Sequence, residues 1–204
     1  MDGIAKITKE SNDEGMAGVP VTRRGTWMQL PQSRIFYPMD PHADDVVIDD
    51  IALSLSRQIR YNGLSDSPIN VAHHSCNTAW LARMEGQSIA VQLAMLMHDA
   101  PEYIIGDLIR PVKVYIPTFS EIEEVIDGKI KERFNLPVIE HELQKHYDNM
   151  AWAWEKRDIF PSARNWPYTA NLPDWLPKLK VWSAEYSRAR FLNDFTQLRY
   201  ELTH

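Results

Sequence analysis

A histidine, an aspartate and a glutamate that could together serve a divalent metal stand within five residues, in the stretch HDAPE at 98–102. Because neighbouring helical positions lie about 100° apart, His98 and Asp99 can both reach one point beside a helix end. Glu102, three and four residues further on, returns to the same face. An imidazole and a carboxylate suit a divalent metal, and a second carboxylate suits proton transfer next to it. The dipeptide alone is weak evidence, since a helix that ends in a capping aspartate gives the same letters.

Two residues elsewhere in the sequence could complete a metal site. His74 lies in the first turns of an expected helix, and Asp148 lies inside a later helix among apolar neighbours. If that helix face is buried, Asp148 needs a partner. Two imidazoles and two carboxylates suit Mn, Fe, Co, Ni or Zn better than Ca. Spacing alone does not bring the four residues together, and each taken singly is more often structural than metal-binding.

Helical periodicity dominates the sequence and has to position these side chains. We expect helices over residues 44–61, 69–84, 87–105, 119–134, 137–160 and 184–202. Short aromatic and β-branched runs at 26–30 and 34–37 flank a proline-containing turn, which indicates a small hairpin or a pair of extended segments. Prolines predict an ordered loop over 106–118 and a long loop or flap over 161–180. The sequence therefore predicts an all-α helical bundle with a small extended or hairpin N-terminal segment.

Length and composition fit one domain over residues 1–204, with a loose lead-in at 1–20. The 204 residues include 44% hydrophobic ones, enough for a sizeable core. A net charge of −6 without a long basic run makes duplex nucleic acid a poor partner. No apolar run is long enough for a membrane span, and a single cysteine, Cys76, fits a reducing compartment. We therefore expect a cytoplasmic protein that contacts neither membrane nor duplex nucleic acid.

Four motifs in order resemble the HD-domain metal-dependent phosphohydrolases: VAHHS (71–75), HDAPE (98–102), GDLxxPVK (106–113) and a later helical aspartate. Within that superfamily the sequence is most similar to the bacterial 5'-deoxynucleotidase branch and its phage-encoded relatives. Those relatives include a dATP triphosphohydrolase of phages that replace adenine with diaminopurine. The resemblance spans about residues 25–200, and it is more specific for the superfamily than for the substrate.

The resemblance implies one divalent transition metal (Zn, Co or Mn) with a defined set of protein ligands. The ligands would be His74, His98, Asp99 and Asp148. The assignment of Asp148 is looser than that of the HD pair, and Asp158 is the competing choice. Where the family commonly has a glutamate before the ligand histidine, this chain has His73, which either binds substrate or packs.

The same resemblance assigns roles around the metal. Glu102 would act as the general acid or base, and Asp107 would assist or orient the water. Arg60 and Lys113 would hold phosphate. Tyr61 stands where the family has tryptophan, and its ring would disfavour a ribose 2'-hydroxyl, although the change from tryptophan weakens that inference.

These residues are compatible with three functions. The first is hydrolysis of dATP to deoxyadenosine and triphosphate, for which Arg57 and Arg110 would add positive charge to that of Arg60 and Lys113. The second is a 5'-deoxynucleotidase that releases phosphate from deoxynucleoside monophosphates. The third, a non-catalytic nucleotide-binding HD protein, is disfavoured because Glu102, Asp107 and Lys113 are all present. We expect a homo-oligomer, in the host cytoplasm if a phage encodes it.

Overall fold

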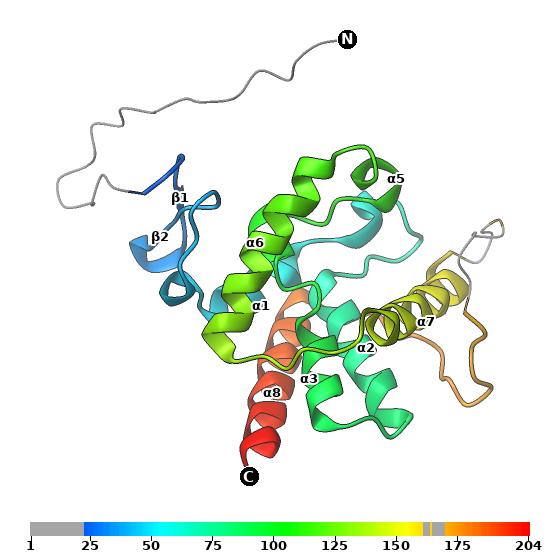
Figure 1. Ribbon diagram of the computed structural model, residues 1–204. Coiled ribbons are helices and arrows are strands. Elements are labelled where there is room, and N and C mark those ends of the chain that lie inside the picture. Colours follow the sequence, from blue (N-terminus) through cyan, green and yellow to red (C-terminus); the bar gives the residue numbers. More distant parts are fainter. Residues whose placement is uncertain (1–22, 161–163, 165–169) are drawn as a thin grey trace.

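Two antiparallel helices form the centre of the fold, α2 (Val71–Met84) and α3 (Ile89–Met97). The computed structural model describes residues 23–160, 164 and 170–204. Nearly all of α2 is buried, and the sequence of α3, IAVQLAMLM, contains no charged residue. Each helix begins at a side-chain cap, since Asn70 accepts from the N–H of His73 and Ser88 accepts from that of Val91. Helices α7 and α8 pack against this pair (Figure 1).

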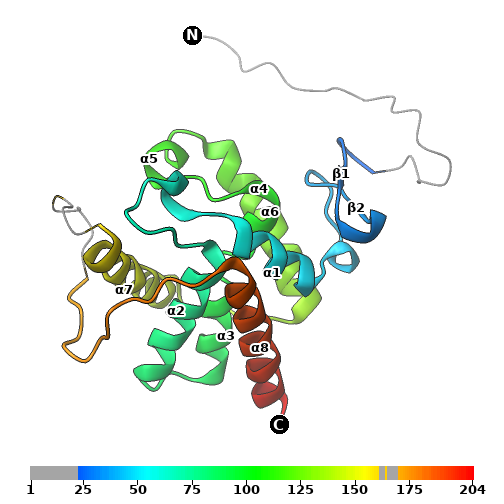
Figure 2. The ribbon, with the colours of Figure 1, turned by 180° about the vertical axis from the view of Figure 1, so that it is seen from behind.

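The remaining helices surround the central pair, which confirms an all-α fold. They are α1 (Ile48–Arg57), α4 (Glu102–Ile105), α5 (Arg110–Lys113), α6 (Pro117–Phe134), α7 (His141–Ile159) and α8 (Ala184–Thr203), with 3₁₀ turns η1 (Pro31–Ser33), η2 (Ala43–Asp45) and η3 (Arg60–Gly63). Seen from behind, α8 runs beside α1, α2 and α3 to the C-terminus (Figure 2). No helix in the described part of the chain is both long and apolar enough to cross a membrane.

The expected N-terminal hairpin is present. Strand β1 (Met28–Gln29) pairs antiparallel with β2 (Ile35–Phe36), with Met28 opposite Phe36. The turn between them places Gln32 and Ser33 at positive φ, 59° and 58°. The guanidinium of Arg34 binds both carboxylate oxygens of Asp50 on α1, at 2.5 and 2.6 Å, and so fixes the hairpin to the bundle. The hairpin lies at one side of the bundle, away from α7 (Figures 1 and 2).

The predicted bounds of the helix over 44–61 are wrong, because the helix is shorter at both ends and only Ile48–Arg57 is α-helical. After Arg57 the chain turns away and pairs with the approach to α2. The Arg60 N–H donates to the Ile69 carbonyl (2.9 Å), and the Val71 N–H donates to the Gln58 carbonyl (3.0 Å). Tyr61 then adopts a positive φ of 57°, which no α-helix contains. Backbone pairing across a loop thus outweighs local helical preference.

Prolines explain two further differences, and two other helices begin later than expected. The helix expected over 87–105 stops at Met97, because Pro101 lacks an N–H and its ring meets the carbonyl four residues earlier. The expected loop over 106–118 contains α5 and the start of α6, since Pro111 and Pro117 occupy first-turn positions where proline is tolerated. Pro137 does not open α7, which begins four residues later at His141. The helix expected from residue 69 begins at Val71.

The segment 170–183 contains no helix or strand, as expected for part of the predicted loop over 161–180. It packs on α7: Trp154 Nε1 donates to the Pro177 carbonyl (3.0 Å), and the Leu179 N–H donates to Asp158 (2.6 Å). The predicted lead-in at 1–20, residues 161–163 and residues 165–169 lie outside the described part of the chain.

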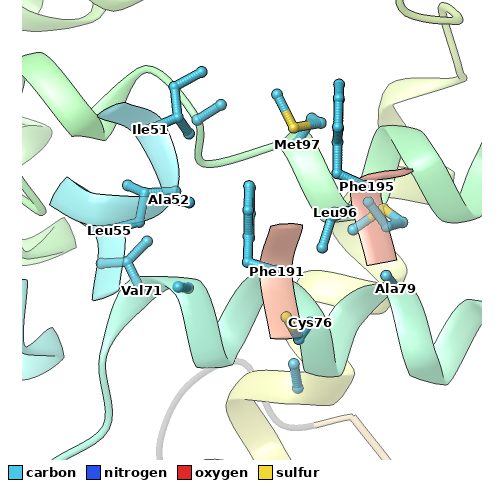
Figure 3. Close-up of a cluster of buried hydrophobic side chains, with 14 of the residues drawn as sticks. Ile51, Ala52, Leu55, Val71, Cys76, Ala79, Leu96, Met97, Phe191 and Phe195 are labelled. Carbon is cyan, nitrogen blue, oxygen red and sulfur yellow. The ribbon is translucent and has the colours of Figure 1, made fainter. Parts of the chain in front are cut away.

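Phe191 on α8 is the side chain on which the bundle's packing is most simply tested. It is fully buried and stands between Ala52 and Leu55 of α1 on one side and Leu96 of α3 on the other (Figure 3). We expect Phe191→Ala to lower the free energy of unfolding by about 3–5 kcal/mol, because a large cavity replaces the ring. Tyr200→Ala, on the same helix but 63% exposed, is the matched control and should change it by less than about 0.5 kcal/mol in denaturant titration. Equal effects of the two substitutions would contradict this account of the core.

Candidate metal centre

Three helices bring the expected donors together. His74 comes from α2, His98 and Asp99 follow the end of α3, and Asp148 comes from α7. One donor atom each from His74, His98 and Asp99 lie within 4.8 Å of one another. The Nε2 atom of His74 is 3.1 Å from Asp148 Oδ1 and 3.6 Å from Asp99 Oδ2. This group of four, two imidazoles and two carboxylates, is the candidate metal centre.

The orientation of His98 fits a metal ligand. Its Nδ1 lies 2.7 Å from the Met95 carbonyl, so Nδ1 donates and Nε2 carries the lone pair. Nε2 is 3.2 Å from Asp99 Oδ1 and 3.9 Å from Asp148 Oδ1, yet it is buried without a hydrogen-bond partner among the described residues. Two carboxylates facing this nitrogen require positive charge between them, either a proton on Nε2, which raises the pKa of His98, or a metal ion bound to its lone pair. The donor set of nitrogen and oxygen suits a divalent transition metal.

Glu155 fixes the second histidine, a role that the sequence did not reveal. Its carboxylate is completely buried and lies 2.6 Å from His74 Nδ1, which leaves Nε2 to face the group. The second carboxylate oxygen of Glu155 accepts from Arg60 Nε (3.2 Å) and from the Tyr61 hydroxyl. Metal-binding histidines commonly donate their other ring nitrogen to a carboxylate in this way. The available signal was spacing, because Glu155 follows Asp148 by seven residues and so lies on the same helix face.

Protons on the imidazoles balance the negative charges of the carboxylates at the metal centre. Burial and the nearby Arg60 oppose a charge on His74, but Glu155 and Asp148 outweigh them and raise the pKa of His74 to about 9. Burial likewise opposes ionisation of Glu155, yet Arg60 and His74 lower its pKa to about 2. Burial opposes ionisation of Asp148, but the hydrogen bond from His74 and the nearby imidazole of His98 outweigh it and hold the pKa of Asp148 well below its usual range. The imidazoles thus carry the positive charge that the carboxylates require, and a bound metal would replace those protons.

Glu102 and Asp107 lie beside the group in a different electrostatic environment. Burial raises the pKa of Glu102 well above its usual range, and Asp99 and Asp107 raise it further. Burial also raises the pKa of Asp107. The Oε2 atom of Glu102 is buried without a hydrogen-bond partner among the described residues. A carboxyl group that holds its proton near the donors is suited to general acid–base work.

Gln58 positions both acidic residues and was not expected to do so. Its amide nitrogen donates to the Glu102 carbonyl (2.8 Å), and its amide oxygen accepts from the Asp107 N–H (3.1 Å). One side chain therefore fixes the backbone on both sides of α4. Its role depends on two contacts, with partners that are 44 and 49 positions away in the sequence, and no local pattern encodes them.

The other expected site residues are placed as follows. Arg60 is buried and its NH1 lies 3.6 Å from Asp99 Oδ2, while the Tyr61 ring packs edge-on against Phe160. Lys113 pairs with Glu123 on α6, with Nζ–O distances of 2.6 and 2.8 Å. Of the two competing ligands, Asp148 joins the group. Asp158 instead pairs with Arg157 and accepts from the Leu179 N–H.

His73 does not join the donors. Its ring stacks on Trp182, with centroids 3.9 Å apart, and burial lowers its pKa to about 4. The two cations expected to add charge are also accounted for. Arg57 is exposed and interacts electrostatically with Glu185, and the guanidinium of Arg110 lies 5.7 Å from the ring centre of Trp152.

Comparison with known proteins shows to which family the chain belongs but does not assign an activity. No model of a known protein family matches it. It is 33% identical over 139 residues to the uncharacterized protein YfdR of Escherichia coli K12. The aligned region covers 68% of this chain and 75% of YfdR. It is 35% identical over 118 residues to an uncharacterized protein of Rhodobacter capsulatus, covering 55% of this chain and 60% of that relative. Fold and site define an all-α protein with a possible metal-binding group of two histidines and an aspartate. The chain belongs to the family of YfdR.

The contact between His74 and Glu155 yields a specific expectation for metal binding. Glu155→Gln leaves all four donors in place but removes the carboxylate that orients and polarises His74. We expect metal affinity to fall about 10–100-fold, as measured by competition with a chelator of known affinity. Asp158→Asn, on the same helix, is the matched control and should bind metal as the unaltered chain does. Unchanged affinity in Glu155→Gln would remove this carboxylate from the metal centre.

Proposed function

We propose that this protein is a metal-dependent phosphohydrolase of the HD type that acts on a deoxynucleotide. The observation that carries the proposal is the convergence of His74, His98, Asp99 and Asp148 from three helices, with His98 Nε2 buried and unpartnered among the described residues. The resemblance of the motifs around these residues to HD-domain phosphohydrolases supports the same assignment. The R. capsulatus and E. coli relatives are themselves uncharacterized and add nothing on activity.

The residues around the donors divide the work of hydrolysis. A divalent metal held by the four donors would lower the pKa of a water molecule and polarise a phosphate oxygen. Glu102, buried and holding its proton, would exchange a proton with the attacking water or the leaving oxygen. Asp107, held by Gln58, would orient that water. Arg60 would offer its guanidinium to phosphate while Glu155 keeps it in place.

For the substrate we propose dATP, with deoxyadenosine and triphosphate as products. The motifs resemble those of a phage dATP triphosphohydrolase, and a triphosphate requires several cations in addition to the metal. One observation favours release of phosphate from a deoxynucleoside monophosphate instead. Lys113 is already neutralised by Glu123, so it must leave this partner before it can bind a phosphate chain.

A direct assay decides between these substrates and a non-catalytic role. The purified chain is incubated with Mn, Co or Zn and each dNTP and dNMP, and triphosphate and phosphate are separated by chromatography. We expect deoxyadenosine and intact triphosphate in one step from dATP, lost on chelation and restored by adding metal back. Phosphate from dAMP with dATP untouched would make the protein a monophosphatase, and no turnover with any metal would refute the enzyme.

The same assay tests whether metal and activity share one site. His98→Ala should lose bound metal and turnover together, because a ligand and the helix-end geometry are removed. His141→Ala replaces an exposed histidine at the start of α7 and should retain both. Full metal occupancy in His98→Ala, by elemental analysis, would exclude His98 from the ligand set.

A substitution of Glu102 tests the chemical step separately from the binding of metal and substrate. We expect Glu102→Gln to keep metal and substrate affinity but to lower kcat about 10²–10⁴-fold, because an amide cannot transfer the proton. Glu121→Gln, an exposed change of the same kind on α6, is the control and should leave kcat unchanged. Near-normal turnover in Glu102→Gln would reduce Glu102 to a structural residue.

A further inference from the structure

A pocket of about 320 Å³ is lined by His73 and Trp154, each next in sequence to a residue of the metal centre or its support, but by none of the four donors. Its lining comes from α2, α7, the segment 170–183 and α8, and none of the described residues in it is a metal donor. Its volume is at the lower end of the range for small-molecule sites, about 300–1,000 Å³. The pocket is thus large enough for a compact ligand, and its lining contains none of the four metal donors.

The walls of this pocket are aromatic. Trp80 and Trp154 lie side by side with ring centroids 5.4 Å apart, and Trp182 stacks on His73 at 3.9 Å. Tryptophan faces offer broad, flat contact surfaces to another ring. These walls favour a planar aromatic group over a branched aliphatic one.

Two residues that line the pocket carry a buried polar atom without a partner among the described residues. The side-chain nitrogen of Asn77, a residue only 5% exposed, is buried without a hydrogen bond to any described residue. The Nδ1 atom of His73, a residue 1% exposed, is in the same state. Buried polar groups are normally satisfied, so an unpartnered side chain at the pocket wall favours a ligand with hydrogen-bonding groups on its ring, which a turn of the Asn77 amide would reach. A heteroaromatic ring meets this requirement and a plain hydrocarbon ring does not.

Positive charge stands on one side of the pocket. Lys178 and Lys180 are exposed lining residues, and neither has an ion pair within the described part of the chain. Arg190 also lines the pocket, but its Nε is bound to Asp194 at 2.7 Å. Two lysines without carboxylate partners favour a ligand that carries a negative charge next to its ring.

We propose that this pocket binds a planar heteroaromatic anion of the size of a nucleoside monophosphate, at a site distinct from the metal centre. The ring would lie against the tryptophans and hydrogen-bond to Asn77, and the anionic group would face Lys178 and Lys180. This proposal does not depend on the proposed hydrolase activity, because no residue of the metal centre takes part.

The probe is radiolabelled AMP, with adenosine as its uncharged counterpart, in equilibrium dialysis against the full chain. The ribonucleotide is chosen because the metal centre is expected to disfavour a 2'-hydroxyl beside Tyr61. We expect one AMP site that persists in His98→Ala, with adenosine bound more weakly. Lys178→Ala/Lys180→Ala should lower AMP affinity at least about tenfold, whereas Lys129→Ala/Lys131→Ala removes the same charge from α6 and should have no effect.

Asn77→Leu tests the hydrogen bond separately and should weaken AMP and adenosine alike. If that buried change prevents folding, the lysine variants still decide, because both side chains are exposed. Loss of AMP binding in His98→Ala would place the probe at the metal centre and overturn the proposal. Unchanged affinity in Lys178→Ala/Lys180→Ala would overturn it as well. Either outcome leaves the metal-dependent turnover assay unaffected, so the two proposals can fail separately.

Discussion

The metal centre depends on the ion pair between His74 and Glu155, whose side chains are both 0% exposed. Burying two charges is costly, and the cost is recovered only with good geometry and further hydrogen bonds. Glu155 obtains those from Arg60 and Tyr61 on η3. The pair therefore fixes α2, α7 and η3 relative to one another. These are also the elements that present His74, Asp148 and Arg60.

Helix α2 is a partition between two different environments. The consecutive residues His73 and His74 point in directions about 100° apart and have different neighbours, since His73 stacks on Trp182 and His74 lies among carboxylates. Helix α7 repeats the arrangement with Trp154 towards the aromatic pocket and Glu155 towards the donors. The two histidines of α2 therefore differ in pKa. Burial lowers the pKa of His73 to about 4, whereas the neighbouring carboxylates raise the pKa of His74 to about 9. One helix thus supports a neutral and a charged imidazole side by side.

The sequence predicts the features that depend on local chemistry. Helix α8 lies within one residue of its expected range, because Ser183 caps it and its apolar residues keep helical spacing. The convergence of His74, His98, Asp99 and Asp148 followed from the motif resemblance and not from spacing. What the sequence did not predict depends on distant contacts. Gln58 binds backbone more than forty residues away. Glu155 shares a helix face with Asp148 in the sequence, but its contact with His74, 81 positions away, forms only when α2 and α7 are packed together.

The donors of the metal centre come from segments up to 74 positions apart, so the unfolded chain cannot present them together. An ion bound to them would join α2, α7 and the end of α3 as a reversible cross-link. It would bind the folded state alone, and mass action would add RT ln(1 + [metal]/Kd) to the stability of the fold. The melting temperature of the protein would then rise and fall with the free metal concentration around it, even when no substrate is present.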